Sequence, residues 1–227
     1  MTIAAALAEV RARVDAAAKR AGREPASAKL VAVSKTHPPE AIREAYAAGQ
    51  RAFGESYAQE LEAKAAALAD LADLEWHFIG HLQSNKAKVV ARVAHLVHAV
   101  HSRDLANELG KRAASAGRAP ISVLVEVKLS DEASKHGAPP AALGALLDAL
   151  AGDARLRLRG LMTMPPPDDL DAARRVFDEL AALREKHGGA ARLPELSMGM
   201  TNDFELAIPA GATLVRVGTA IFGARPA

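Results

Sequence analysis

Two hydrophobic periods alternate along the chain, and this alternation limits the possible folds more than any other feature. Short apolar runs rich in β-branched residues are separated by longer segments with helical spacing. The runs lie at 29–35, 50–55, 75–80, 95–100, 120–127, 156–162, 194–198 and 213–218. The helical segments lie at 38–49, 57–72, 84–92, 103–117, 139–150, 169–187 and 202–210. Strands that alternate with helices are typical of βαβ units and a parallel sheet.

Eight candidate strands with right-handed crossovers can close as a single (β/α)8 barrel of the TIM type. An open doubly wound sheet is the alternative. We favour the barrel because polar motifs follow many different strands, and a barrel brings all these strand ends to one mouth. An amphipathic segment at about residues 2–21 precedes the first strand and is expected to close the outer helical ring. No linker divides the chain, so one barrel domain over residues 1–227 is expected.

Composition excludes several classes of protein. The net charge of +2 and an aromatic content of 4% do not favour nucleic-acid binding. The absence of cysteine excludes disulfides and thiolate chemistry, and the eight histidines have no compact ligand spacing, so no metal is expected. No apolar run approaches the ~20 residues of a membrane span. Because the N-terminus also lacks signal-peptide order, we expect a cytoplasmic protein without nucleic-acid or membrane partners.

Lys35 ends the most apolar strand, in the segment LVAVSKTHPP. A side chain at the end of a barrel strand points into the barrel mouth. A lysine amine that is desolvated there attacks aldehydes and ketones. Lys35 is therefore a candidate Schiff-base lysine, and a solvated lysine at a strand end is the alternative.

The loop ELSMGMTNDFELAI (195–208) follows the seventh candidate strand. Its strand ends at Ser197, Gly199 permits an unusual backbone angle, and Thr201 or Asn202 can cap a helix. A hydroxyl beside free N–H groups at a helix start can hold an anion. Barrels often bind phosphate with the loops after their last two strands, so this loop is a candidate phosphate site; an ordinary turn is the alternative.

The last strand and its loop, LVRVGTAIFGA (214–224), carry the second candidate phosphate site. Gly218 and Thr219 follow the strand at a turn that leaves N–H groups free. Arg216 stands two residues before Gly218, on the same face, and is expected to point into the barrel near the phosphate. An interior arginine needs a partner, which is either a ligand or a buried carboxylate such as Glu126.

Other polar residues stand at or near strand ends. Glu55, Ser56 and Tyr57 follow the second candidate strand, and His77 lies within the third. The polar segment SDEASKHG (130–137) is interpreted as a surface loop, with a lid over the mouth as the alternative.

The chain resembles a known family, the pyridoxal phosphate homeostasis proteins, whose fold is similar to the N-terminal domain of alanine racemase. The resemblance extends from about Leu30 to Arg225. Seven motifs carry it in order: AVSKTHPPEAI, FGESYAQE, WHFIGHLQSNK, DEASKHG, LRGLMTM, LSMGMTNDFELAI and VRVGTAIFGAR.

The resemblance implies a fold type III barrel that binds pyridoxal 5′-phosphate (PLP), a form of vitamin B6. Lys35 is expected to hold PLP as an internal aldimine. Ser197, Gly218 and Thr219 are expected to bind the phosphate. Arg216 is expected near the pyridine nitrogen, where an arginine keeps that nitrogen unprotonated and limits carbanion chemistry.

The resemblance also extends the expected cofactor-binding set to Ser56, His77 and Gly199. The family usually has an asparagine where this chain has Ser56, so the serine is a shorter polar substitute near the cofactor. His81 replaces a residue that is commonly proline, and no functional role is assigned to it.

The resemblance implies a protein tied to PLP supply, often monomeric and without established catalysis, and our leading hypothesis is a monomeric PLP carrier or buffer that supplies apo PLP-dependent enzymes. Related racemases use a tyrosine from a second domain, which this chain is expected to lack, so we expect no catalysis. The alternative is a slow racemase-like PLP enzyme on a small amino acid, with His77, Tyr57 or Lys86 as acid or base. A regulatory module and a cofactor-free Schiff-base aldolase are further alternatives.

Overall fold

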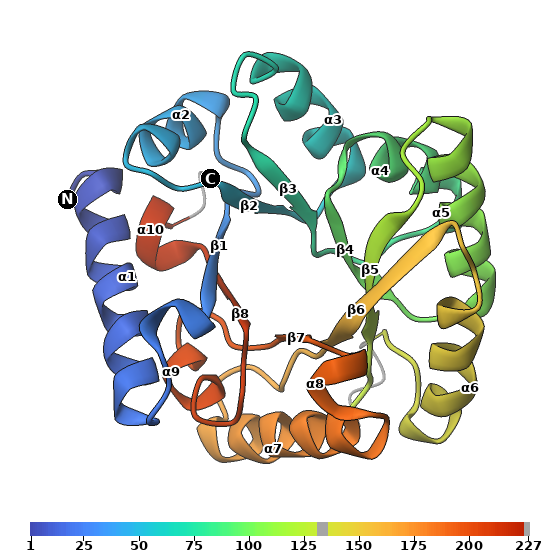
Figure 1. Cartoon of the computed structure of the whole chain (residues 1–227). Coiled ribbons are helices and arrows are strands. Elements are labelled where there is room, and N and C mark those ends of the chain that lie inside the picture. Colours follow the sequence, from blue (N-terminus) through green and yellow to red (C-terminus); the bar gives the residue numbers. More distant parts are fainter. Residues whose placement is uncertain (131–135, 225–227) are drawn as a thin grey trace.

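The computed structural model describes residues 1–130 and 136–224. Eight parallel strands form a closed barrel in the order β1 to β8, with the helices outside it (Figure 1). The strands are β1 Lys29–Val33, β2 Ala52–Glu55, β3 Glu75–Phe78, β4 Leu96–Val100, β5 Ile121–Glu126, β6 Leu156–Met162, β7 Glu195–Ser197 and β8 Leu214–Val217. Because β1 pairs with β8, the barrel prediction is confirmed and the open sheet is excluded.

The expected helical segments are all helical in part, and their ends differ from the expected ones by a few residues. The helices are α1 Ile3–Arg20, α2 Pro39–Ala47, α3 Ala58–Ala67, α4 Ala87–Val93, α5 Arg103–Ser115, α6 Pro140–Ala151, α7 Leu170–Lys186, α8 Gly189–Arg192, α9 Phe204–Ala207 and α10 Thr219–Phe222. Two 3-10 turns are η1 Pro25–Ser27 and η2 Ser84–Lys86. The sequence did not predict η1, α8 and α10, because three or four residues are too few for a hydrophobic period. In the described part of the chain, no helix combines the length and hydropathy needed to cross a membrane.

The additional N-terminal helix, α1, is confirmed as part of the outer ring (Figure 1). It begins after Thr2, whose side chain accepts a hydrogen bond from the N–H of Ala5. It packs against α2, α9 and α10. Because α10 has only four residues, α1 covers the part of the barrel that a full eighth helix would cover.

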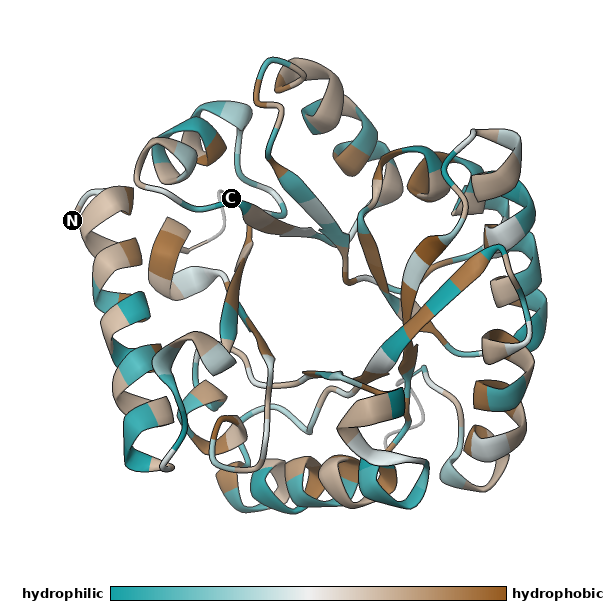
Figure 2. Ribbon diagram, in the orientation of Figure 1, coloured by the Kyte–Doolittle hydropathy of each residue, from teal (hydrophilic) through white to brown (hydrophobic). Residues whose placement is uncertain are grey.

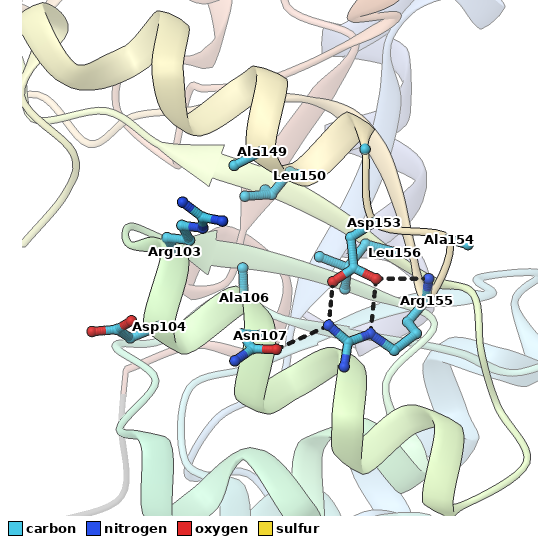
Figure 3. Close-up of a pocket in the computed structure, with 11 residues that line it drawn as sticks. Arg103, Asp104, Ala106, Asn107, Ala149, Leu150, Asp153, Ala154, Arg155 and Leu156 are labelled. Carbon is cyan, nitrogen blue, oxygen red and sulfur yellow. Dashed lines mark hydrogen bonds and ion pairs between the residues drawn. The ribbon is translucent and has the colours of Figure 1, made fainter.

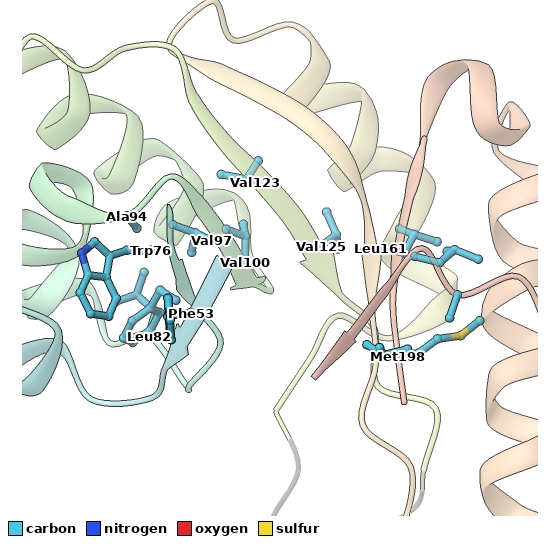
Figure 4. Close-up of a cluster of buried hydrophobic side chains, with 14 of the residues drawn as sticks. Phe53, Trp76, Leu82, Ala94, Val97, Val100, Val123, Val125, Leu161 and Met198 are labelled. Atoms are coloured by element: carbon cyan, nitrogen blue, oxygen red, sulfur yellow. The ribbon is translucent and has the colours of Figure 1, made fainter. Parts of the chain in front are cut away.

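Side chains alternate between the two faces of each strand, as the barrel requires. On β5, Val123 and Val125 point outward into the core under the helices, part of which Figure 4 shows. Leu124, between them, belongs to a smaller apolar cluster inside the barrel. Colouring by hydropathy shows the same organisation, with hydrophobic segments on the strands and mixed segments on the surrounding helices (Figure 2). The interior therefore has room for inward-pointing polar residues near both ends of the barrel.

Candidate ligand site at the barrel mouth

A cavity of about 400 Å³ lies at the carboxyl ends of the strands, and we call it the mouth cavity. Its volume lies within the usual range of small-molecule sites. The structure brings five of the eight expected site residues together in its wall. These five are Lys35, Ser56, Arg216, Gly218 and Thr219.

Lys35 follows β1 by two residues, in a turn that is held on both sides. The carbonyl of Ser34 accepts a hydrogen bond from Lys64 Nζ at 2.7 Å, and the N–H of Thr36 donates to Glu60 Oε1 at 2.6 Å. Thr36 has a φ of 68°, which a β-branched residue rarely adopts. Such strain persists where surrounding contacts determine the backbone. The turn therefore presents Lys35 from a fixed position.

A buried ion pair lies beneath this turn. Lys64 Nζ is 2.8 Å from Glu55 Oε1, which also accepts a hydrogen bond of 2.6 Å from Ser34 Oγ. Both charged side chains are buried. Burial raises the pKa of the Glu55 carboxyl, and the positive charge of Lys64 opposes that shift. Sequence reasoning noticed Glu55 but missed Lys64, whose one available signal was its i,i+4 spacing from Glu60.

Arg216 points into the barrel, as its position two residues before Gly218 predicted. Its Nη1 donates to Ser197 Oγ at 2.6 Å, and its Nη2 donates to the carbonyl of Thr163 at 3.0 Å. Burial lowers the pKa of the guanidinium to about 10, although the nearby carboxylates of Asp203 and Glu126 act in the opposite direction. The side chain therefore remains a cation at neutral pH. Arg216 and Glu126 form no direct ion pair among the described residues, although the carboxylates of Asp203 and Glu126 both favour the charged guanidinium.

Ser197, which the sequence assigns to a phosphate, is not among the residues that line the mouth cavity. It is the last residue of β7, and its hydroxyl points into the barrel, where it contacts Arg216 and His98. From this loop, the residues that line the cavity are Met200, Thr201, Asn202 and Asp203. Thr201 therefore supplies the hydroxyl of this loop at the cavity. The signal for it was present, because the sequence places a second hydroxyl just beyond Gly199.

Gly199 does not line the cavity either. Its φ is 92°, and a Cβ at this position would lie 2.7 Å from Ala207 Cβ. The glycine thus allows α9 to pack closely against the loop. The residue at the N-cap of α9 is Asp203, not Thr201 or Asn202. Asp203 lines the cavity, and burial raises the pKa of its carboxyl.

His77 lies toward the opposite end of the barrel. It lines a cavity of about 370 Å³ at the amino ends of the strands, which we call the floor cavity. Lys29, Glu75, His95 and Arg157 are among the other lining residues. The mouth cavity is lined mostly by residues at or beyond the carboxyl ends of the strands. His77 lies before the last residue of β3 and points inward, so its side chain is too deep in the barrel to reach the mouth cavity.

Glu126, the last residue of β5, is a buried carboxyl with an unusual pKa. Its Oε2 atom is buried and has no hydrogen-bond partner among the described residues. Burial raises the pKa from 4.5 to about 7, and the attraction of Arg216 only partly offsets this effect. Near neutral pH the carboxyl therefore exchanges a proton inside the barrel.

Replacing Glu126 with glutamine is expected to raise the free energy of unfolding by up to about 3 kcal/mol at about pH 8. The folded pKa of about 7 exceeds the unfolded value of 4.5, so the folded wild type binds the extra proton between these values. Wild-type stability therefore falls as pH rises through this window, whereas glutamine does not ionise. Urea unfolding at several pH values would measure the difference, which should nearly vanish at about pH 4, below the unfolded pKa.

Glu179→Gln is the matched control, because it makes the same chemical change at an exposed position on α7. It should change stability by less than about 0.5 kcal/mol at either pH. A pH-independent effect of Glu126→Gln would contradict the assignment of a buried, proton-exchanging carboxyl.

A larger cavity, of about 440 Å³, lies outside the barrel between α5 and the end of α6 (Figure 3). Arg155 in its wall is held by Asp153 and Asn107. None of the expected site residues lines it. The mouth cavity is therefore the candidate ligand site.

The interpretation of residues 130–137 as a surface loop or lid falls mostly on residues 131–135, which lie outside the described residues.

The fold and the mouth cavity together define a (β/α)8 barrel with a lysine and an arginine in one small-molecule site. The sequence matches the family model "Alanine racemase, N-terminal domain" over residues 6–226. It is 49% identical to the pyridoxal phosphate homeostasis protein of Pseudomonas aeruginosa, covering 99% of this chain and 96% of that protein. It is 45% identical to the Escherichia coli K12 protein of the same name, covering 98% and 97% of the two chains.

Solved structures agree with these sequence matches. PipY of Synechococcus elongatus PCC7942 without PLP superimposes with a TM-score of 0.87 at 41% identity, covering 98% of this chain and 100% of that chain. PipY has also been solved with PLP bound, with a TM-score of 0.84 to this chain. Alanine racemase of Corynebacterium glutamicum, with a TM-score of 0.66 and 20% identity, shares the fold over 62% of its length. The chain belongs to the alanine racemase N-terminal domain family, among the pyridoxal phosphate homeostasis proteins, as the sequence motifs predicted.

Proposed function

We propose that this chain is a single-domain PLP carrier or buffer that binds PLP in the mouth cavity, with a Schiff base to Lys35. The observation that carries the proposal is that Lys35, Arg216, Gly218 and Thr219 line one cavity. Lys35 lies far from the other three in the sequence, and closure of the barrel between β1 and β8 brings it next to them.

The residues around the cavity fit the three functional groups of PLP. The Lys35 amine attacks the aldehyde carbon, a C=N bond forms, and the aldehyde oxygen leaves as water. Gly218 and Thr219 stand where α10 begins, and the first N–H groups of a helix have no acceptor within it, so they suit a phosphate. Thr201, which carries a hydroxyl, also lines the cavity. Arg216 supplies a donor for the ring nitrogen, which weakens the ring as an electron sink.

The comparisons support PLP as the ligand. PipY, at 41% identity, has been solved with PLP bound. The relatives at 45% and 49% identity are named for PLP homeostasis, not for a reaction.

Three residues bear on the choice between carrier and enzyme. His77, Tyr57 and Lys86 are the acid or base candidates of the racemase-like alternative, and none is among the described residues that line the mouth cavity. This favours a carrier over the racemase-like enzyme. We further propose that the carrier is a cytoplasmic monomer that releases PLP to apo PLP-dependent enzymes. Substantial PLP-dependent turnover of a natural amino acid, lost in Lys35→Ala, would support the enzyme instead.

The first test is the absorbance spectrum of the purified protein with added PLP. We expect the visible band of a Schiff base, trapped by borohydride on Lys35 and absent in Lys35→Ala. Lys86→Ala is the matched control, because Lys86 is half-buried but does not line the mouth cavity. If neither the wild type nor the control shows the band, PLP is not the ligand and a phosphosugar becomes the next candidate.

A further inference from the structure

A chain of four buried polar side chains crosses the barrel interior from the floor cavity to the mouth cavity. His77 Nδ1 on β3 lies 3.0 Å from His98 Nε2 on β4. His98 Nδ1 lies 2.8 Å from Ser197 Oγ on β7, which lies 2.6 Å from Arg216 Nη1 on β8. Exposure does not exceed 5% for any of the four. Buried polar groups of this kind stabilise a structure only when every donor and acceptor is satisfied.

The chemistry of the arginine sets the direction of the whole chain. A guanidinium can only donate, so Ser197 Oγ accepts from Arg216 and its own hydrogen is free to donate to His98 Nδ1. His98 must then carry its proton on Nε2 and donate to His77 Nδ1. If His98 instead carried its proton on Nδ1, Ser197 Oγ would accept from both His98 and Arg216. The hydroxyl hydrogen of Ser197 would then have no acceptor among the described residues.

The surroundings keep His98 neutral, as this arrangement requires. Burial, together with the nearby His77 and Arg216, lowers the pKa of the imidazole well below its ordinary value. A neutral imidazole offers one donor and one acceptor, which match the two hydrogen bonds that His98 makes.

We propose that His98 and Ser197 are positioning residues that hold Arg216 in one orientation at the mouth cavity. The proposal rests on the proposed function, in which Arg216 faces the ring nitrogen of PLP. Ser197 and the carbonyl of Thr163 anchor the two Nη atoms, so the plane of the guanidinium is fixed. Other donors of the guanidinium remain for a ligand in the cavity that Arg216 lines. Ser197 thus acts on the cofactor through Arg216.

The first test does not depend on PLP. Side-chain ¹⁵N NMR of the ligand-free protein at neutral pH should identify His98 as the neutral Nε2–H tautomer. An Nδ1–H tautomer or a charged imidazolium at His98 would overturn the proposed direction of the chain.

The second test compares variants by the absorbance maximum of bound PLP and by the affinity for PLP. His98→Leu removes both hydrogen bonds and should shift the maximum and weaken binding at least about tenfold. His98→Gln keeps a donor and an acceptor and should restore both values. His95→Leu is the matched control, because His95 lines the floor cavity and bonds the N–H of Trp76, outside the chain of four.

Equal effects of His98→Leu and His95→Leu, or no rescue by glutamine, would overturn the positioning role. If the wild type bound no PLP, the proposed function would fail, while the NMR measurement would still test the direction of the chain.

Discussion

Replacing Lys64 with methionine is expected to lower the free energy of unfolding by about 3–5 kcal/mol at neutral pH. Methionine preserves most of the side-chain volume but removes the cation, which leaves Glu55 as a buried charge with only the Ser34 hydroxyl as a partner. Burial already raises the pKa of Glu55, and loss of the lysine raises it further. Because protonation removes the buried charge, the loss of stability should become smaller as the pH falls. Urea unfolding across pH measures both effects.

Two comparisons isolate the buried ion pair. Adding Glu55→Gln to Lys64→Met removes the stranded charge and should recover part of the stability. Arg112→Met breaks another i,i+4 pair, with Glu108, that is largely exposed on α5, and should cost less than about 1 kcal/mol. Equal losses for Lys64→Met and Arg112→Met would refute the importance of burial.

Loss of Lys64 also affects the turn that carries Lys35. Lys64 bonds the carbonyl of Ser34, and its partner Glu60 holds the N–H of Thr36. Without Lys64, the strained turn loses the hydrogen bond to the Ser34 carbonyl. The hydrogen bond from Thr36 to Glu60 is also weakened, because Glu60 loses its ion-pair partner. Schiff-base formation with PLP should therefore be slower in Lys64→Met than in Arg112→Met, as the visible absorbance band would report.

The barrel was predictable because its evidence is spread over the whole chain. Each strand and each long helix shows its own hydrophobic period in the sequence. Eight strand–helix units can form only a few parallel-sheet topologies, and a closed barrel is one of them. The inward direction of Arg216 was predictable for the same reason, since it follows from the two-residue period of β8. Lys35 could be assigned to the mouth because it directly follows an unambiguous strand.

The sequence did not predict how deep each inward-pointing side chain lies in the barrel. Ser197 and Thr201 are four residues apart, and the choice between them depends on where the three-residue strand β7 ends. A shift of a few residues moves a side chain from the mouth to the interior, as also happened with His77. The role of Lys64 was hidden for a different reason, because a lysine inside a helix reads as solvent-exposed until its buried partner Glu55 is known.

Gly160→Ala is expected to cost at least about 3 kcal/mol of stability, because two effects add at this position. Gly160 on β6 pairs with Glu195 on β7, and its φ is 153°. A Cβ there would lie 1.8 Å from the carbonyl oxygen of Glu195, so the two backbones would have to separate. Thermal or urea unfolding would measure the loss.

Gly117→Ala separates the two effects, because Gly117 also has a positive φ, of 67°, but a Cβ there would meet no atom within 4 Å. That variant should cost only about 1–2 kcal/mol, from backbone strain alone. The loss of stability in Gly160→Ala beyond that in Gly117→Ala is then the free-energy cost of separating the closely packed backbones of β6 and β7. Since β7 ends at Ser197, which contacts Arg216, Gly160→Ala should also weaken PLP binding, whereas Gly117→Ala should not. Equal losses of stability in the two variants would mean that β7 can move away from β6 at little cost, and Ser197 would then be too loosely held to orient the arginine.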